Sequence, residues 1–172
     1  YTFWKDEKCV PQRRAKGRNA SLSLAFQEDG VLVRMAISYV SEAQAWKNLS
    51  SSTADDFDEA RAQNNKAWDA ALGSVEVFGG SNDDHEEFYS HLYHAFIHPN
   101  LVSDIDGQYL GGNGKVYQDT LRPHYSSFSV WDTYRTQGPL LALLFPDKAS
   151  DMMQSLVDFA DQTGGLGRWI LA

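Results

Sequence analysis

The sequence contains one cysteine, Cys9, among its 172 residues. A single cysteine excludes a disulfide bond within the chain and any zinc module built on several cysteines. Long apolar runs are also absent, because no stretch approaches the ~18 residues that a membrane-spanning helix needs. We therefore expect no membrane segment in these residues.

Positive charge is scarce as well. Lysine and arginine number 15 against 23 aspartate and glutamate residues, which gives a formal net charge of -8. Residues 1–18 hold six of the basic residues, and the rest of the chain is strongly acidic. The basic run at 13–18 could bind a polyanion, but a solvated loop is the simpler interpretation. The overall balance argues against nucleic-acid binding, which a basic stripe would indicate.

Apolar residues make up 42% of the chain and aromatic residues 13%, which is too much for a disordered protein. The length suits about one domain. The sequence opens on Tyr1 without an initiator methionine and closes on the apolar stretch 169–172. We expect a piece of a longer protein, so the lack of a signal peptide here says nothing about secretion.

Residues 20–40 alternate between apolar and polar side chains on both sides of a turn at 28–30. This period of two predicts a β-hairpin with one buried face. Because a lone hairpin is marginally stable in water, we expect its partner strands upstream of Tyr1. The alternating apolar residues are Leu22, Leu24, Phe26, Val31, Val33, Met35, Ile37 and Tyr39.

Helical periodicity follows the alternation. Helices are predicted over 41–50, 55–72, 83–98, 131–145 with an interruption at Gly138-Pro139, and 148–162. Residues 99–128 have no helical stripe and are predicted as loop with short extended pieces. Strands before helices indicate segregated β and α parts, an α+β arrangement. We expect the stripe of Phe88, Leu92 and Phe96 to stay exposed, since its helix lacks partners.

A stripe of Glu87, His91, His94 and His98 lies on one face of the third predicted helix. His91 and His98 are separated by about 10 Å along the axis, so one metal ion cannot bind all of them. His91 and His94 could chelate with help from elsewhere, but a polar stripe is the simpler interpretation. The sequence therefore predicts no metal site in this chain.

Other common reaction chemistries lack their motifs. There is no Gly-x-Ser-x-Gly elbow for a nucleophilic serine, and Cys9 has no evident histidine partner. The run from Gly111 to Lys115 lacks the spacing of a phosphate-binding loop, and we interpret it as a flexible turn.

The segment 99–135 combines aspartates with many aromatic residues. Carboxylates accept hydrogen bonds from vicinal hydroxyls, and aromatic faces pack against sugar rings. A long loop with both is often functional, so the segment indicates a carbohydrate site, although aromatic residues also fill cores. Asp132 has two interpretations: it completes a capping box with Ser129, or it points into a pocket beside Arg135.

Four blocks of sequence closely resemble glycoside hydrolase family 92, whose members are exo-acting α-mannosidases, many of them specific for α-1,2 linkages. They occur in the family's order, and the likeness as a whole covers about residues 30–160. The blocks are ISYVS at 37–41, FYSHLYHA at 88–95, PNLVSDIDG at 99–107 and FSVWDTYR at 128–135.

The resemblance implies an α+β multidomain fragment. Residues 1–46 would be the C-terminal strands of a β-sandwich, 47–80 linker helices, and 81–172 the first helices of a catalytic (α/α)6 barrel. It also implies calcium-dependent hydrolysis with inversion, acting on mannose-containing oligosaccharides or glycoproteins. The residues carried over as substrate contacts are Asp132 above all, then Trp131, Arg135, Asp104 and Asp106.

An inverting glycosidase needs a carboxylic acid and a carboxylate base. In the family both come from beyond the last residue of this chain, as do the calcium ligands. We therefore expect no catalytic residue in the chain and no turnover by it alone. The end of the chain also departs from the family pattern, with Ile170 where a glutamate is common.

Asn19 and Asn48 each begin an N-glycosylation sequon, which is compatible with secretion and an extracellular location. The cytosol or a vacuole stays open as the alternative location. Two further functions stay open at this stage. The chain could be a non-catalytic carbohydrate-binding or degenerate protein, or part of an (α/α)6 glycosidase specific for another sugar.

Overall fold

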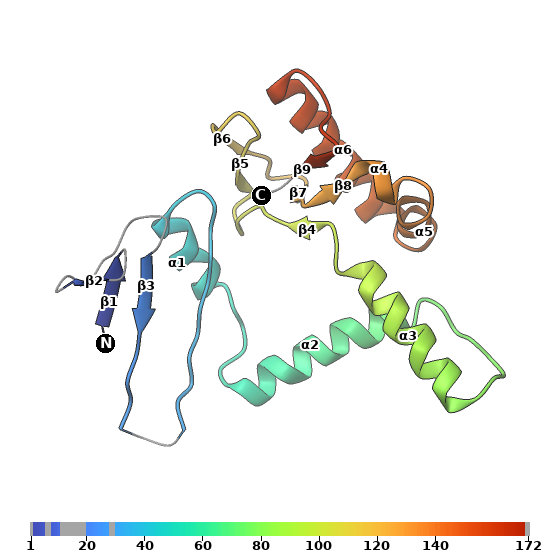
Figure 1. Ribbon diagram of the computed structural model, residues 1–172, viewed down its shortest axis with the longest axis horizontal. Coiled ribbons are helices and arrows are strands. Elements are labelled where there is room, and N and C mark those ends of the chain that lie inside the picture. The colour runs from blue at the N-terminus through green and yellow to red at the C-terminus, as the bar shows by residue number, and fades with distance from the viewer. Residues whose placement is uncertain (1, 6–7, 11–19, 28–29, 171–172) are drawn as a thin grey trace. The chain divides into compact units, whose positions relative to one another are not determined.

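The computed structural model describes residues 2–5, 8–10, 20–27 and 30–170 of the chain (Figure 1). The chain divides into two compact units, Tyr1–Val33 and Arg34–Ala172. It is a mixed α and β structure with small antiparallel sheets. Among the described residues, none of the helices is both long and apolar enough to cross a bilayer.

The first unit contains a three-stranded antiparallel sheet in the order β2-β1-β3. Its strands are β1 (Thr2–Lys5), β2 (Lys8–Val10) and β3 (Ala20–Ser23). Strand β1 is central and aligns Phe3 with Leu22 of β3.

The hairpin predicted over residues 20–40 is wrong. β3 ends at Ser23, and neither 24–27 nor 30–38 contains a strand. The expected apolar face is exposed, with Phe26 at 54% and Met35 at 83% of full accessibility. Strand β3 instead pairs with β1, inside the chain and earlier in sequence. A period of two reports how side chains alternate in an extended segment, but it does not say which segment pairs with it.

The second unit opens with three helices, close to the predicted ranges: α1 (Glu42–Ser50), α2 (Phe57–Leu72) and α3 (Asn82–Phe96). Each begins where a side-chain oxygen accepts a backbone N–H of the first turn. Ser41 caps α1, Asp56 caps α2, and Ser81 forms a reciprocal capping box with Asp84 at α3. These local signals explain why the helices could be predicted.

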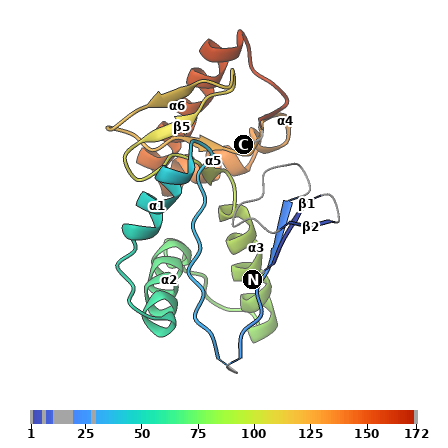
Figure 2. The ribbon, with the colours of Figure 1, turned by 90° about the vertical axis from the view of Figure 1, so that its left-hand side faces the viewer.

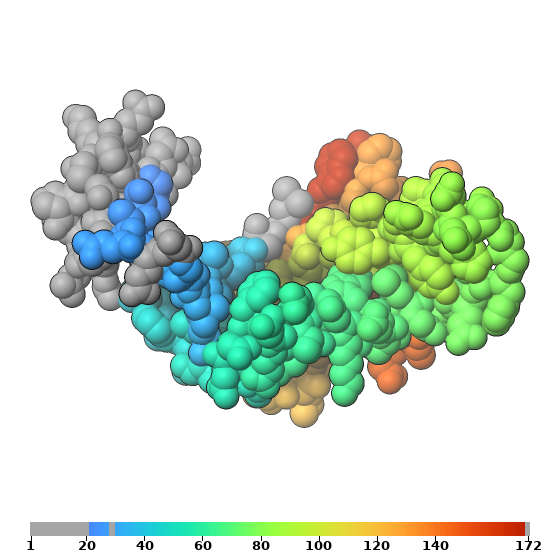
Figure 3. All heavy atoms as spheres, turned by 90° about the horizontal axis from the view of Figure 1, so that it is seen from below, coloured from blue at the N-terminus to red at the C-terminus, as the bar shows by residue number. Residues whose placement is uncertain are grey.

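Helices α2 and α3 pack against each other (Figure 3). The rings of Trp68 and Tyr93 have centroids 4.5 Å apart, and the Tyr89 hydroxyl donates to the Val75 carbonyl at 3.1 Å. Leu92 on the same helix is buried. The stripe expected to stay exposed is therefore partly covered within the chain itself.

The predicted loop between α3 and the later helices is confirmed as irregular chain with short strand pairs. β4 (Asn100–Leu101) pairs with β7 (Tyr125–Ser126), and β5 (Gln108–Leu110) pairs with β6 (Val116–Gln118). The β5–β6 turn packs closely on the last helix, because a Cβ added to Gly112 would lie 2.5 Å from the Phe159 ring. The glycine run therefore permits close packing, a role that the interpretation as a flexible turn missed.

The last part of the unit holds three helices (Figure 2), α4 (Val130–Thr133), α5 (Gln137–Leu144) and α6 (Pro146–Thr163). In the sequence they lie between two paired strands (Figure 1), β8 (Phe128–Ser129) and β9 (Trp169–Ile170). The predicted interruption at Gly138-Pro139 is misplaced, since the chain leaves the helix at 134–136. Pro139 is the third residue of α5, where its missing N–H has no partner within the helix in any case.

The main core lies between these strands and helices. Phe128, Leu141, Met152 and Ile170 are buried together, and Phe96 of α3 meets Phe145 edge to face at 5.3 Å. The core thus joins residues that are up to 74 positions apart in the sequence. It fixes the places of α4 and the strands that flank it.

Gly107 and Gly114 test how tightly the loop is built, because both have positive φ angles. A Cβ at Gly107 would lie 2.0 Å from the Asp119 carbonyl oxygen, whereas a Cβ at Gly114 meets nothing within 4 Å. We expect Gly114→Ala to lower the free energy of unfolding by about 1 kcal/mol through backbone strain. Gly107→Ala adds a steric clash and should cost roughly 3 kcal/mol or more.

Urea unfolding of the full-length protein carrying each variant measures the difference. Equal losses in the two variants would contradict the close contact between Gly107 and the Asp119 carbonyl.

Candidate functional site

The residues predicted to contact substrate occupy two places in the second unit. Asp104 and Asp106 lie in the turn before β5, against α1. Trp131 and Asp132 lie in α4, and Arg135 follows it. The structure thus divides the predicted set into an aspartate turn, residues 104–107, and an α4 cluster.

Asp104 is buried, with 6% of its surface exposed. Its Oδ2 accepts a hydrogen bond from the Ser38 hydroxyl, and its Oδ1 accepts one from the Asn48 amide, both at 2.7 Å. The turn is closed by the Gly107 N–H, which donates to the Asp104 carbonyl at 2.8 Å. Both carboxylate oxygens therefore join the aspartate turn to α1 and to the segment before it.

Asp106 is bound from α1 as well. Lys47 Nζ lies 2.9 Å from Oδ2, and the Gln44 amide donates to both carboxylate oxygens, at 2.9 and 3.1 Å. The hydrogen bond from Lys47, then that from Gln44, lower the pKa of Asp106 to about 2. Asp106 is ionised at neutral pH, with its oxygens directed at α1 and at Gln108.

A cavity of about 690 Å³ adjoins this turn. Its wall includes Asp104 and Asp106, and also Asp119 and Arg122, which are joined by an ion pair at 3.2 Å. The Asp119 carboxylate also accepts from the N–H groups of Leu121 and Arg122, and these bonds lower its pKa. The carboxylates of the wall are therefore all bonded to groups within the fold.

The α4 cluster is arranged differently. Ser129 makes no side-chain cap of α4, and its hydroxyl donates to Asp132 Oδ2 instead. The capping-box interpretation of Asp132 is therefore wrong, because the carboxylate bonds a side chain rather than the backbone. Asp132 is exposed and presents its other oxygen without a described partner.

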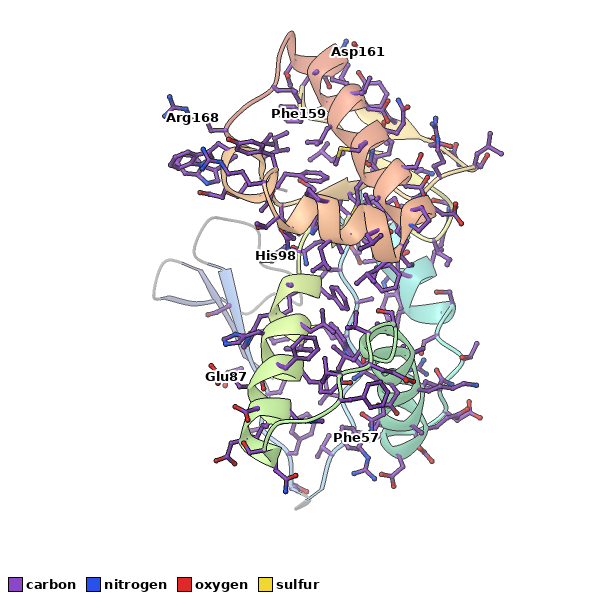
Figure 4. The ribbon with its side chains drawn as sticks, turned by 90° about the vertical axis from the view of Figure 1, so that its right-hand side faces the viewer. Phe57, Glu87, His98, Phe159, Asp161 and Arg168 are labelled. Atoms are coloured by element: carbon purple, nitrogen blue, oxygen red, sulfur yellow. The ribbon has the colours of Figure 1, made fainter. Side chains whose placement is uncertain are left out.

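Aromatic residues lie close to Asp132 in the sequence, and the strand pairing adds Trp169 beside Trp131. Trp131 meets Trp169 edge to face with ring centroids 5.6 Å apart, and each is more than half exposed. The guanidinium of Arg135 lies 5.2 Å from the Tyr134 ring centre and donates to its hydroxyl at 2.6 Å. Figure 4 shows the neighbouring Arg168 extending away from the helices.

Trp169 was not among the contacts predicted from the sequence, because only the β8–β9 pairing brings it beside Trp131. Gln44, Lys47 and Asn48 were missed as partners of the aspartates for a similar reason. Each lies more than 50 residues from the carboxylate that it binds, and no local pattern links the two segments.

His124, just before β7, is a second buried titratable residue. The ring of His124 stacks on Tyr109 at 3.6 Å, and its Nδ1 lies 3.8 Å from Asp158 on α6. Burial lowers the pKa of His124, while Asp158 and then Asp119 act in the opposite direction. The neutral ring therefore works as a packing surface that joins the loop to α6.

The described residues do not fit a bound metal ion. None of their histidine, cysteine, aspartate and glutamate side chains gather in threes. Calcium takes six to eight oxygen ligands, but the Asp106 oxygens face the Lys47 ammonium group. Among the described residues, one buried side-chain atom has no hydrogen-bond partner, Gln44 Oε1. It lies on the side chain whose amide nitrogen binds Asp106. His91 on α3 is exposed and pairs with Glu87 at 3.5 Å.

Comparison with known protein families identifies the family of this chain. The profile of the glycosyl hydrolase family 92 catalytic domain matches residues 44–172, which is most of the chain. The chain belongs to glycosyl hydrolase family 92. The resemblance seen in the four sequence blocks is confirmed.

Solved structures agree with the family. The chain is similar to the family GH92 α-mannosidase BT3965 from Bacteroides thetaiotaomicron, with 27% identity and a TM-score of 0.80 over 99% of this chain. That enzyme has also been solved with mannoimidazole. The inverting mannosidase BT2199 from the same bacterium matches 77% of this chain and 18% of its own length, with 28% identity and a TM-score of 0.70. Comparison with curated protein sequences gives no significant match.

The chain spans about a quarter of the BT3965 enzyme. It therefore represents only part of what a family 92 glycosidase of that length contains. The aspartate turn and the α4 cluster both lie within the family match at 44–172.

The Lys47–Asp106 pair gives a pH-dependent prediction. The folded pKa of Asp106, about 2, lies below the ordinary value near 4. Its ionised form therefore stabilises the fold above about pH 4, and this contribution is lost as the pH falls toward 2. Lys47→Met should raise the Asp106 pKa and lower the midpoint of thermal unfolding at pH 6.

The gap in midpoint between wild type and Lys47→Met should narrow as the pH falls from 5 to 3. Lys115→Met is the control, because it removes the same charge and the Lys115 side chain pairs with no described residue. A gap that stays constant with pH would contradict the assigned cause of the Asp106 pKa.

Proposed function

We propose that the full-length protein is an exo-acting α-mannosidase that hydrolyses terminal α-linked mannose from N-glycans or mannans with inversion. Family membership and the mannosidases among its structural relatives support this proposal. The observation that carries it within the chain is the α4 cluster, where an exposed aspartate is flanked by exposed tryptophan and arginine side chains.

In this proposal Asp132 binds the terminal mannose. Its carboxylate is held by the Ser129 hydroxyl and can accept hydrogen bonds from sugar hydroxyls. Trp131 and Trp169 offer aromatic faces to the C–H side of a ring and exclude water from it. Arg135 is a donor to ring oxygens or hydroxyls. Asp104 and Asp106 remain proposed substrate contacts. Because their carboxylates already accept hydrogen bonds within the fold, we expect them to bind the sugar less strongly than Asp132 does.

Inversion needs a general acid and a general base about 6.5–9.5 Å apart. We propose that both residues, and the ligands of a calcium ion, lie in the remainder of the full-length protein. Calcium would polarise the substrate or orient its hydroxyls there. The chain described here would bind and orient the sugar, so by itself it should not turn substrate over.

The proposed architecture follows from the same assignment. Residues 1–46 are the end of a β-sandwich, 47–80 are linker helices, and 81–172 begin an (α/α)6 barrel. Several large apolar side chains of α5 and α6 are exposed, among them Leu143 at 78% and Val157 at 51%. Further barrel helices would cover them, which is consistent with a chain that spans a quarter of its relative. Secretion, with a glycan on Asn19, is part of the proposal; Asn19 lies outside the described residues.

Substitution of Asp132 tests the proposed role in the full-length enzyme. Asp132→Asn should lower kcat/KM on an aryl α-mannoside by about 10- to 100-fold, because a charged hydrogen bond to the sugar contributes roughly 1.5–3 kcal/mol. Asp161→Asn is the matched control, since it removes one exposed carboxylate at the outer end of α6 (Figure 4). Unchanged kinetics in Asp132→Asn would remove Asp132 from the substrate site.

Substrate and metal dependence are tested in the same assay. Mannoside should be hydrolysed, an aryl α-glucoside should not, and a calcium chelator should abolish turnover until calcium is restored. Preferred hydrolysis of the glucoside would instead assign another sugar specificity.

The isolated 172-residue chain gives a further test. It should release no mannose at concentrations at which the full-length enzyme is readily assayed. Release by the chain that disappears in Asp132→Asn would show that the acid and base lie within it, contrary to the proposal.

A further inference from the structure

Asn48 uses its whole side-chain amide within the fold. Its Nδ2 donates two hydrogen bonds, one to the Ile37 carbonyl at 3.0 Å and one to Asp104 Oδ1 at 2.7 Å. Its Oδ1 accepts a bond from the Ile105 N–H at 3.0 Å. Both amide hydrogens and the amide oxygen are thus engaged, and the Asp104 and Ile105 partners lie more than 50 residues away in the sequence.

The most important of these partners is Asp104. A buried carboxylate is stable only when donors replace the water that it has lost. One oxygen of Asp104 accepts a hydrogen bond from the Asn48 amide and the other accepts one from the Ser38 hydroxyl, and the residue is 6% exposed. Loss of either donor would leave a buried charge incompletely paired, which is more costly than the loss of an ordinary surface hydrogen bond.

We call Ser38, Asn48 and Asp104 the Asp104 clamp. It joins the segment before α1, helix α1 itself and the aspartate turn. Ser38 is fixed in turn, because its Oγ accepts the N–H groups of Val40 and Ser41. The clamp thus sets one wall of the 690 Å³ cavity, to which Asn48, Asp104 and the following Ile105 all contribute.

Asn48 is also the first residue of the sequon Asn48-Leu49-Ser50. An N-linked glycan replaces one of the two hydrogens on Nδ2. Because Nδ2 uses both hydrogens, one for the Ile37 carbonyl and one for Asp104, a glycosylated Asn48 must give up one of these two bonds. The sugar would also need room beside a buried carboxylate.

We propose that Asn48 is a structural residue of the Asp104 clamp and that the two hydrogen bonds of its Nδ2, to Ile37 and to Asp104, exclude a glycan, so the folded protein carries no glycan there. This proposal replaces the sequence-based assignment of Asn48 as a glycosylation site. It does not depend on the mannosidase activity, and its tests measure only mass and stability.

The first experiment maps glycans on the full-length protein secreted from a eukaryotic host. Lys66→Thr creates a new sequon at the exposed Asn64 of α2 and shows that the host modifies this part of the chain. In a host where that control carries a glycan, peptide mass spectrometry should find Asn48 unmodified. A glycan on Asn48 in the folded secreted protein would overturn the proposal.

The second experiment separates the sequon from the amide. Ser50→Ala destroys the sequon and leaves the Asn48 amide in place, so the midpoint of thermal unfolding should shift by less than about 2 °C. Asn48→Asp sets a second carboxylate against Asp104 and should lower the midpoint by about 5 °C or more. Ser38→Ala, a milder change, should lower it by less.

The double variant Asn48→Asp with Asp104→Asn restores one amide and one carboxylate at the same contact. It should recover a good part of the loss, because the new amide can donate to the new carboxylate. An unchanged midpoint of thermal unfolding in Asn48→Asp would show that the clamp does not hold this part of the fold. The same conclusion would follow if the double variant lost as much in midpoint as the two single variants lose together.

Discussion

The buried carboxylate of Asp104 is the constraint on which the wall of the cavity beside the aspartate turn depends. A charge removed from water has to find donors, and here both donors are neutral groups from a distant part of the chain. Meeting that requirement brings α1 and the preceding segment against the aspartate turn. Once the turn is in place, Asp106 meets Gln44 and Lys47, and Gly107 approaches the Asp119 carbonyl.

The carboxylates of the second unit therefore have distinct roles. Those of Asp104, Asp106 and Asp119 are occupied by donors within the fold, and hydrogen bonds lower the pKa values of Asp106 and Asp119. Asp132 has a single hydroxyl partner and follows the exposed Trp131, which contacts Trp169. A sugar hydroxyl competes with existing partners at the first three residues, but meets an available oxygen at Asp132. This difference is why the proposed substrate contact is centred on α4.

How far the fold could be predicted depended on how local each signal was. The helices at 42–50, 57–72 and 82–96 were predicted well, because Ser41, Asp56 and Ser81 cap them within a few residues. The hairpin at 20–40 was predicted wrongly, because strand pairing is decided by a partner elsewhere in the chain. The helix break was placed at Gly138-Pro139, although a proline in the first turn needs no break.

The sequence by itself determined the helices, the irregular segment between α3 and α4 and, through its four blocks, the family. These follow from short-range periodicity, capping and recognisable runs of residues. Only the tertiary structure decided that Asn48 is bound to Asp104, that Trp169 lies beside Trp131, and that Ser129 bonds the Asp132 carboxylate instead of capping a helix. The first two contacts join residues 38 or more positions apart, and the third is a choice between two local hydrogen bonds. The first two contacts depend on tertiary packing, which no local pattern encodes.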